Sequence, residues 1–180
     1  MPTVVPIRLQ IQRAISEVLL EVNPDNGYEF DLRPAEDEQP RIVRGRLTIG
    51  DDEPLPMVTI LEPPLHPVPT DTMRQPDNTA RQTEWDLIIQ GFAMDDPVNP
   101  TDIAYQFEAE VRRCMAMQKK RRDGGVGSIR HLNILGLGDK IQGMTFGNPV
   151  IRPSETVANQ AMFYFVLTVK FCEDMESAIG

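Results

Sequence analysis

Apolar residues recur every three or four positions in the first segment of this chain, from Pro6 to Val22. This spacing gathers them on one stripe and predicts an amphipathic helix. Proline suits the first turn of a helix, and Asn23-Pro24 is expected to end it. The stripe consists of Ile7, Ile11, Ile15, Val18 and Val22.

The same helical spacing returns between Asn99 and Arg122. Asn99 is expected to cap this second helix, with Pro100 at its first position and Asp102 in its first turn. The glycines that follow Asp123 predict its end. Its apolar stripe consists of Ile103, Phe107, Val111, Cys114 and Met115.

Alternating apolar and polar residues, or short apolar runs between turn residues, predict strands elsewhere. Trp85, Leu87 and Ile89 alternate with polar residues, so one face of their strand is expected to be buried. The last strand is apolar on both faces, which favours a central place in the sheet or cover by a neighbour on both sides. The predicted strands are Arg41 to Ile49, Met57 to Leu61, Thr83 to Ala93, a short glycine-interrupted segment at Ile129 to Leu137, one or two within Lys140 to Arg152, and Ala161 to Cys172.

Two connections lack such patterns. The segment from Asp25 to Pro40 is polar and is predicted to be a loop. The segment from Pro63 to Arg81 contains five prolines and few apolar residues. A loop of this length within a compact domain is usually functional or disordered.

The order of elements is a helix, three strands, a helix, and two or three strands. The simplest layered arrangement packs both helices on one face of the sheet. The sequence therefore predicts an α+β fold with a mixed, mostly antiparallel sheet, in a single domain that spans residues 1–180.

Net charge narrows the function classes. The chain carries a formal charge of −9, and its sequence pI is about 4.7. A general nucleic-acid binder is expected to be basic, and an anionic membrane attracts basic segments, so both classes are disfavoured. No apolar run is long enough to span a membrane, and the N-terminus lacks the pattern of a secretory signal. We expect the protein to fold in a cytoplasm or in a particle assembled there.

Catalytic and metal-binding patterns are lacking in the sequence. His66 and His131 lie far apart, and neither has a cysteine at ligand spacing. Cys114 and Cys172 fall in periodic segments and are expected to be buried free thiols, which are usually inert. The glycine-rich stretches match no phosphate-binding pattern. We therefore expect no enzyme activity, no cofactor and no metal.

One feature of the second helix stands out, a group of cations near its end. Such cations complement the helix dipole, which accounts for them without any partner. Alternatively, they contact an acidic protein surface or DNA phosphates. We add two residues of the proline-rich loop to them as candidate contacts between subunits or with partners. The candidates are Arg112, Arg113, Lys119, Lys120, Arg121, Arg122, His66 and Arg74.

Three segments together resemble a known family. RGRLTIGDDEPLPMVTILEPP (Arg44 to Pro64) is similar to a stretch of the tail terminator, or tail completion, proteins of siphophages. TEWDLIIQGFAMDDPVNPTDIAYQFEAEV (Thr83 to Val111) resembles the strand and helix that follow in that family. RPSETVANQAMFYFVLTVKFCED (Arg152 to Asp174) resembles its last strand. The three segments cover about half of the chain and occur in the order of the family.

The resemblance implies a structural role in the neck region of a virion, assembled in the host cytoplasm. Such proteins form a ring, typically a hexamer, on the head-proximal end of the tail tube. The ring ends tube polymerisation and joins the tail to the head connector or stopper protein. DNA passes through its lumen without sequence-specific binding. The family fold is a mixed sheet flanked by helices, and it has no catalytic residues to transfer.

Two other interpretations stay open. The chain could be a head–tail adaptor or another neck protein, which tail length in a deletion strain would distinguish. It could also be a small ligand-binding domain or enzyme outside any virion. In that case a pocket would hold polar groups with displaced pKa values.

Overall fold

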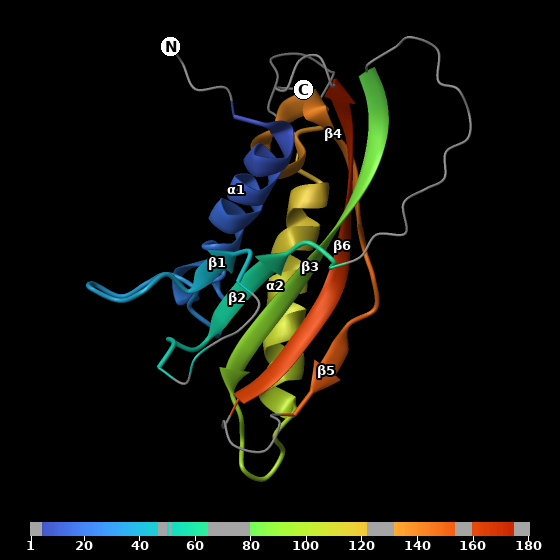
Figure 1. The fold of residues 1–180 in the computed structure, drawn as a ribbon. Coiled ribbons are helices and arrows are strands. Elements are labelled where there is room, and N and C mark those ends of the chain that lie inside the picture. The colour runs from blue at the N-terminus through green and yellow to red at the C-terminus, as the bar shows by residue number, and fades with distance from the viewer. Residues whose placement is uncertain are drawn as a thin grey trace.

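The computed structural model describes residues 5–46, 50, 52–64, 80–121, 132–153 and 160–174. It confirms the α+β class, with two α-helices packed on a six-stranded mixed sheet (Figure 1). The helices are α1 (Ile7–Leu19) and α2 (Asp102–Lys119), and three 3-10 turns are η1 (Pro24–Asn26), η2 (Ile134–Gly136) and η3 (Gly138–Lys140). The strands are β1 (Ile42–Arg44), β2 (Met57–Leu61), β3 (Ala80–Met94), β4 (Ile141–Phe146), β5 (Val150–Arg152) and β6 (Gln160–Asp174).

The two longest strands form the centre of the sheet. Its strand order is β1-β2-β3-β6-β4, and β5 also pairs with β6. β3 and β6 are antiparallel along all 15 residues, from Ala80 opposite Asp174 to Met94 opposite Gln160. The β1–β2 pair is parallel, while the other pairs are antiparallel. β6 therefore has the central place that its apolar character predicts.

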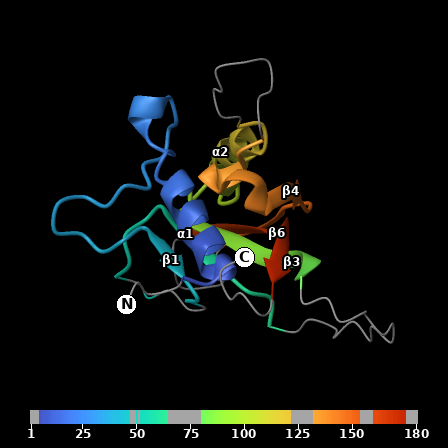
Figure 2. The same cartoon turned by 90° about the horizontal axis from the view of Figure 1, so that it is seen from above.

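Both helices lie on the same side of the sheet (Figure 2). Alternation along a strand sends odd-numbered side chains of β3 and β6 toward these helices. Phe107 of α2 lies at the middle of the layer, with ring-centroid distances of 4.7 Å to Phe30 and 5.3 Å to Phe163. All three phenylalanines are buried. The core is thus a sandwich of one sheet face and two helices.

Helix boundaries differ from the prediction. α1 ends at Leu19, three residues before the predicted end, and the chain continues into η1. The prediction of Asn99 as the cap of the second helix is wrong, because Thr101 holds that position. The carbonyl of Asn99 accepts a bond from the Asp102 N–H (3.1 Å), which closes a turn before the helix. The helix ladder starts only with the Tyr105 N–H, which donates to the Thr101 carbonyl (3.1 Å).

The prediction of an interrupted strand at Ile129 to Leu137 is also wrong where the structure describes it. Residues 132–137 form an isolated bridge and η2, and residues 129–131 lie outside the described part. Leu135 and Gly136 have φ angles of 57° and 72°. Positive φ angles are incompatible with an extended strand. Ile134 and Leu135 are nevertheless buried, as their apolar character would suggest.

The polar loop from Asp25 to Pro40 holds core residues that the sequence pattern did not reveal. Tyr28, Phe30 and Leu32 are buried within it. The carboxylate of Glu110 in α2 accepts bonds from the backbone N–H groups of Glu29 (2.8 Å) and Phe30 (3.1 Å). These bonds hold the loop against the helix and satisfy donors that lie outside any strand.

Two other predicted segments are only partly described. β1 is shorter than predicted and ends at Arg44, before Gly45 at φ +72°. Residues 47–49 lie outside the described part, as do residues 65–79 of the proline-rich segment. The segments from Met57 to Leu61 and from Thr83 to Ala93 are confirmed as strands, and β3 extends the second at both ends.

Packing around Gly91 gives a stability prediction. A β-carbon there would lie 2.2 Å from Cε1 of Phe163 and 3.1 Å from Cε1 of Phe107. We expect Gly91→Ala to lower the free energy of unfolding by about 1–3 kcal/mol, as overpacked cores do. Urea denaturation measures this loss of stability. Gly143→Ala in β4 is the matched control, because no atom lies within 4 Å of its β-carbon position. Equal losses in the two variants would contradict this account of the core.

Candidate interaction surfaces

The cations of α2 divide into two groups with different surroundings. Arg112 crosses from α2 to the connection between β4 and β5, where its Nη2 donates to the carbonyl of Gly147 (3.0 Å). Its Nε lies 2.6 Å from Oε1 of Glu108, a close ion pair that is not aligned as a hydrogen bond. Its guanidinium lies 5.2 Å from the ring centroid of Phe165. Through these contacts, Arg112 stabilises the packing of α2 against the sheet.

Arg113 points to the other flank of α2. Its guanidinium lies 5.2 Å from the ring centroid of Tyr28, in the loop that α2 anchors. Cations over aromatic faces are attracted by the ring quadrupole. Arg113 therefore stabilises the docked loop, although its side chain remains exposed.

The remaining described cations lie together where α2 ends. Lys119, Lys120 and Arg121 are exposed, and no carboxylate of the described residues forms an ion pair with them. Nη1 of Arg121 donates to Oε1 of Gln118 (3.3 Å), and the carbonyl of Arg121 accepts a bond from the Asn133 N–H (3.0 Å). We call these three residues the cationic end of α2. The other candidates, Arg122, His66 and Arg74, lie outside the described residues.

The face of the sheet opposite the helices is partly apolar. Its side chains come from even-numbered positions of β3 and β6, and no described helix lies over it (Figure 2). At one end the face is polar, with the Thr168 hydroxyl donating to Asp86 (2.6 Å). The half-buried apolar side chains of this open face are Ile88, Phe92, Met162, Tyr164 and Val166.

Sequence reasoning missed this open face, although the signal was present. The apolar residues on both faces of the last strand predict either a central place in the sheet or cover on both sides. β6 is indeed central within the sheet, but the described helices cover one face alone. Apolar residues on the second face therefore mark a surface that a single copy leaves partly exposed.

The sheet also has an incompletely paired central strand. β2 faces only the second half of β3, and no described strand pairs with residues 80–87 on that side. Val58 N–H donates to the carbonyl of Arg41 and Gly45 N–H donates to that of Ile60, so Val58 and Ile60 face β1. Alternate residues of β2 therefore face β3. The corresponding unpaired backbone groups of β3 are those of Gln82, Glu84 and Asp86.

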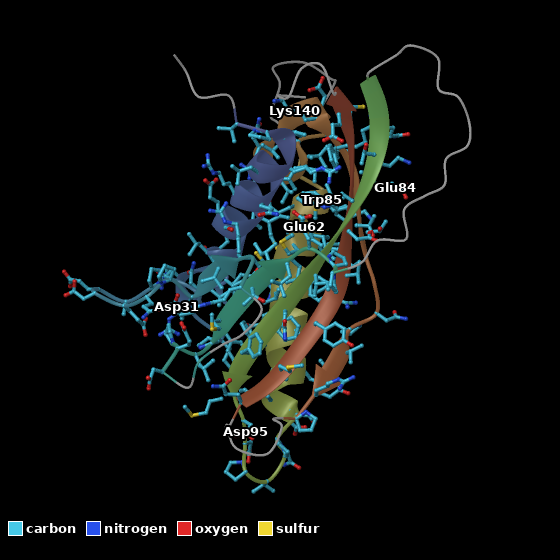
Figure 3. The ribbon with its side chains drawn as sticks, viewed as in Figure 1. Asp31, Glu62, Glu84, Trp85, Asp95 and Lys140 are labelled. Atoms are coloured by element: carbon cyan, nitrogen blue, oxygen red, sulfur yellow. The ribbon has the colours of Figure 1, made fainter. Side chains whose placement is uncertain are left out.

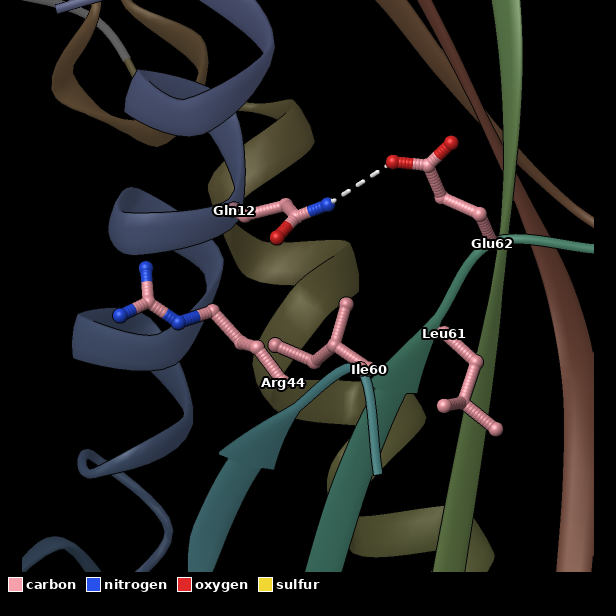
Figure 4. A pocket seen from close by; sticks show the side chains of 6 residues that line it. Gln12, Arg44, Ile60, Leu61 and Glu62 are labelled. Atoms are coloured by element: carbon pink, nitrogen blue, oxygen red, sulfur yellow. Dashed lines mark hydrogen bonds between the residues drawn. The ribbon is translucent and has the colours of Figure 1, made fainter. Parts of the chain in front are cut away.

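A groove of about 400 Å³ opens where β2 ends beside α1 (Figure 4). It is lined by Gln12, Arg44 and Glu62, together with residues of β2. Nε2 of Gln12 donates to Oε1 of Glu62 (3.4 Å). A smaller hollow of about 250 Å³ brings Lys119 near Lys170 and Glu84 beside β4. Among the described residues that line the two hollows, none is a nucleophile with an aligned base.

The two thiols have opposite environments. Cys114 is buried, its Sγ donates to the carbonyl of Val18 (3.3 Å), and burial raises the pKa of its thiol to about 11, assisted by Glu21. The prediction that Cys172 is buried is wrong, because this side chain is exposed beside Nε2 of Gln142 (2.8 Å). Cys172 occupies an even-numbered position of β6, and the side chains at these positions point away from the helices.

Compared with models of known protein families and with curated protein sequences, the chain matches none. Among the described residues, no three His, Cys, Asp or Glu side chains gather as a metal site. No helix in the described part has the length and apolar character needed to cross a membrane.

The thiol environments predict selective alkylation. We expect one thiol of the native protein to react with a maleimide at neutral pH, because the pKa of Cys114 is raised and its side chain is buried. Cys172→Ser should abolish that reaction, while Cys114→Ser should leave it unchanged. Intact mass after labelling measures the stoichiometry. Labelling of Cys114 in the folded Cys172→Ser variant would contradict the described packing.

The different surroundings of Arg112 and the exposed lysines predict different effects of their substitution on stability. We expect Arg112→Ala to lower the free energy of unfolding by about 1–3 kcal/mol, because it removes a charged hydrogen bond and leaves Glu108 unpaired. Lys119→Ser and Lys120→Ser should each change it by about 0.5 kcal/mol or less, as exposed substitutions do. Thermal and urea denaturation test the difference. If all three substitutions had the same effect, the structural role of Arg112 would be refuted.

Proposed function

We propose that this chain is a tail terminator of a siphophage, a structural subunit that forms a ring on the head-proximal end of the tail tube. The observation that carries the proposal is the open sheet face. Apolar side chains of β3 and β6 remain partly exposed there, which is typical of a surface that another protein covers. The described part offers such surfaces and no arranged reaction centre.

The resemblance supports the proposal because its three segments are contiguous in space. Residues 44–64 contain β2, residues 83–111 contain most of β3 and the first half of α2, and residues 152–174 contain β6. β2, β3 and β6 are adjacent strands, and α2 packs on the two central ones. The segments that resemble the family thus make up the middle of one sheet and the helix that covers it.

The proposed ring has partners on both of its sides. The tail tube protein would lie on one side and the head connector or stopper protein on the other. A net charge of −9 is compatible with DNA that passes through the lumen without adhering, since affinity for DNA comes largely from cations that neutralise phosphates. In this proposal no membrane, metal or cofactor takes part.

A tube-growth assay tests the proposal. Purified protein added to polymerising tail tube protein should stop growth and bind to tube ends, as seen by electron microscopy. Phe92→Glu places a charge on the open face and should weaken ring formation about tenfold or more, because a buried unpaired charge is costly. Gln39→Glu, at an exposed position of the loop between α1 and β1, is the control and should behave as the wild type.

Two results would refute the proposed function. One is tube length that is unaffected by the protein at any ratio. The other is normal tail length in a phage that lacks the gene, since loss of a terminator produces over-long tubes. Free tails of normal length would instead favour a head–tail adaptor.

A further inference from the structure

Exposed apolar side chains are concentrated at one end of the molecule. Met94, Val98 and Tyr105 are 68%, 81% and 57% exposed, and all lie between the end of β3 and the first turn of α2. Single exposed apolar residues are common on protein surfaces, whereas several along one connection are typical of a surface that another protein covers. We call residues 94–105 the tip.

The tip is also acidic. Asp95, Asp96 and Asp102 lie within it, and it contains no lysine or arginine. No described cation forms an ion pair with these aspartates. Oδ1 of Asp96 accepts a bond from the Val98 N–H (2.7 Å), which fixes the shape of the turn. The tip is therefore an ordered apolar surface bordered by unpaired negative charges.

The cationic end of α2 has the opposite charge and a similar apolar neighbour. Met117, 59% exposed, precedes Lys119, Lys120 and Arg121 on the same helix. The 18 residues of α2 separate the two surfaces by about 27 Å, at about 1.5 Å of rise per residue. Figure 3 shows Asp95 at one extreme of the molecule and Lys140, near the end of α2, toward the other. The two surfaces therefore cannot meet within one copy.

We infer that the tip of one copy docks on the cationic end of α2 of a second copy. The charges are complementary, and docking would cover the exposed apolar side chains of the tip and Met117 beside the cationic end. Contact between two different patches of identical chains is head to tail, so it propagates into a ring where the rotation closes. The inference rests on the proposed function and specifies a contact, in addition to the open face, through which the subunits of the ring meet.

Charge reversal in both surfaces tests the inference on the full chain. Asp95→Lys with Asp96→Lys reverses the tip, and Lys119→Glu with Lys120→Glu reverses the cationic end. Each pair alone should weaken self-association about tenfold or more in sedimentation equilibrium, because like charges then face each other. All four substitutions together should restore association, since each reversed tip then meets a reversed cationic end.

Matched controls separate the site from net charge. Glu17→Lys with Glu36→Lys changes the net charge as the tip variant does, at exposed positions outside both surfaces. These substitutions should leave self-association within about threefold of the wild type. Thermal unfolding of every variant verifies that loss of association is not loss of the fold. Raising the salt concentration should weaken the wild-type contact, because salt screens exposed charges.

The outcomes distinguish this inference from the proposed function. A wild type that stays monomeric at all concentrations, or single-surface variants that associate normally, would overturn the inference. Failure of the fourfold variant to recover would also overturn it, because the two surfaces would then not face each other. If such variants still stop tube growth, the proposed function stands without this contact. Loss of tube binding with unchanged self-association would show that the cations bind the tube protein instead.

Discussion

The antiparallel pairing of β3 with β6 is the constraint on which the rest of the structure depends. These strands pair along 15 residues, which fixes the direction of every side chain in the centre of the sheet. A shift by one residue would turn Phe163 and Phe165 away from the helices and Tyr164 toward them. The phenylalanines pack in the aromatic cluster around Phe107, so only the observed register buries them.

Because both helices pack on one face of this sheet, the opposite face remains partly exposed in a single copy. Two helices suffice to build the core, and the described residues add no third layer. Phe92 and Tyr164 consequently lie on a face that is only half-buried in a single copy. In the proposed role, assembly supplies the missing layer and the unpaired part of β3 gains neighbours. Surfaces of this kind support the proposed role in assembly.

The cations of α2 illustrate how helical phase assigns different roles to one residue type. Successive residues of a helix point about 100° apart, so Arg112 and Arg113 reach opposite flanks. One is bound to the β4–β5 connection and the other covers Tyr28. Where the helix ends, Lys119 and Lys120 are exposed and form no ion pair with a described carboxylate. Charge alone therefore does not identify the interaction residues in this cluster.

The sequence by itself determined the elements with strong periodicity. The helical stripes, the buried run from Met57 to Leu61 and the alternation in the last strand required only local spacing, and they predict the α+β class correctly. The cationic cluster could likewise be found, but not which of its members the fold uses. Tertiary structure decided the burial of Phe30, which Glu110 binds across 80 positions, and the exposure of Cys172, which depends on where the helices lie. Such features depend on residues distant along the chain, and local patterns carry no information about which of them will meet.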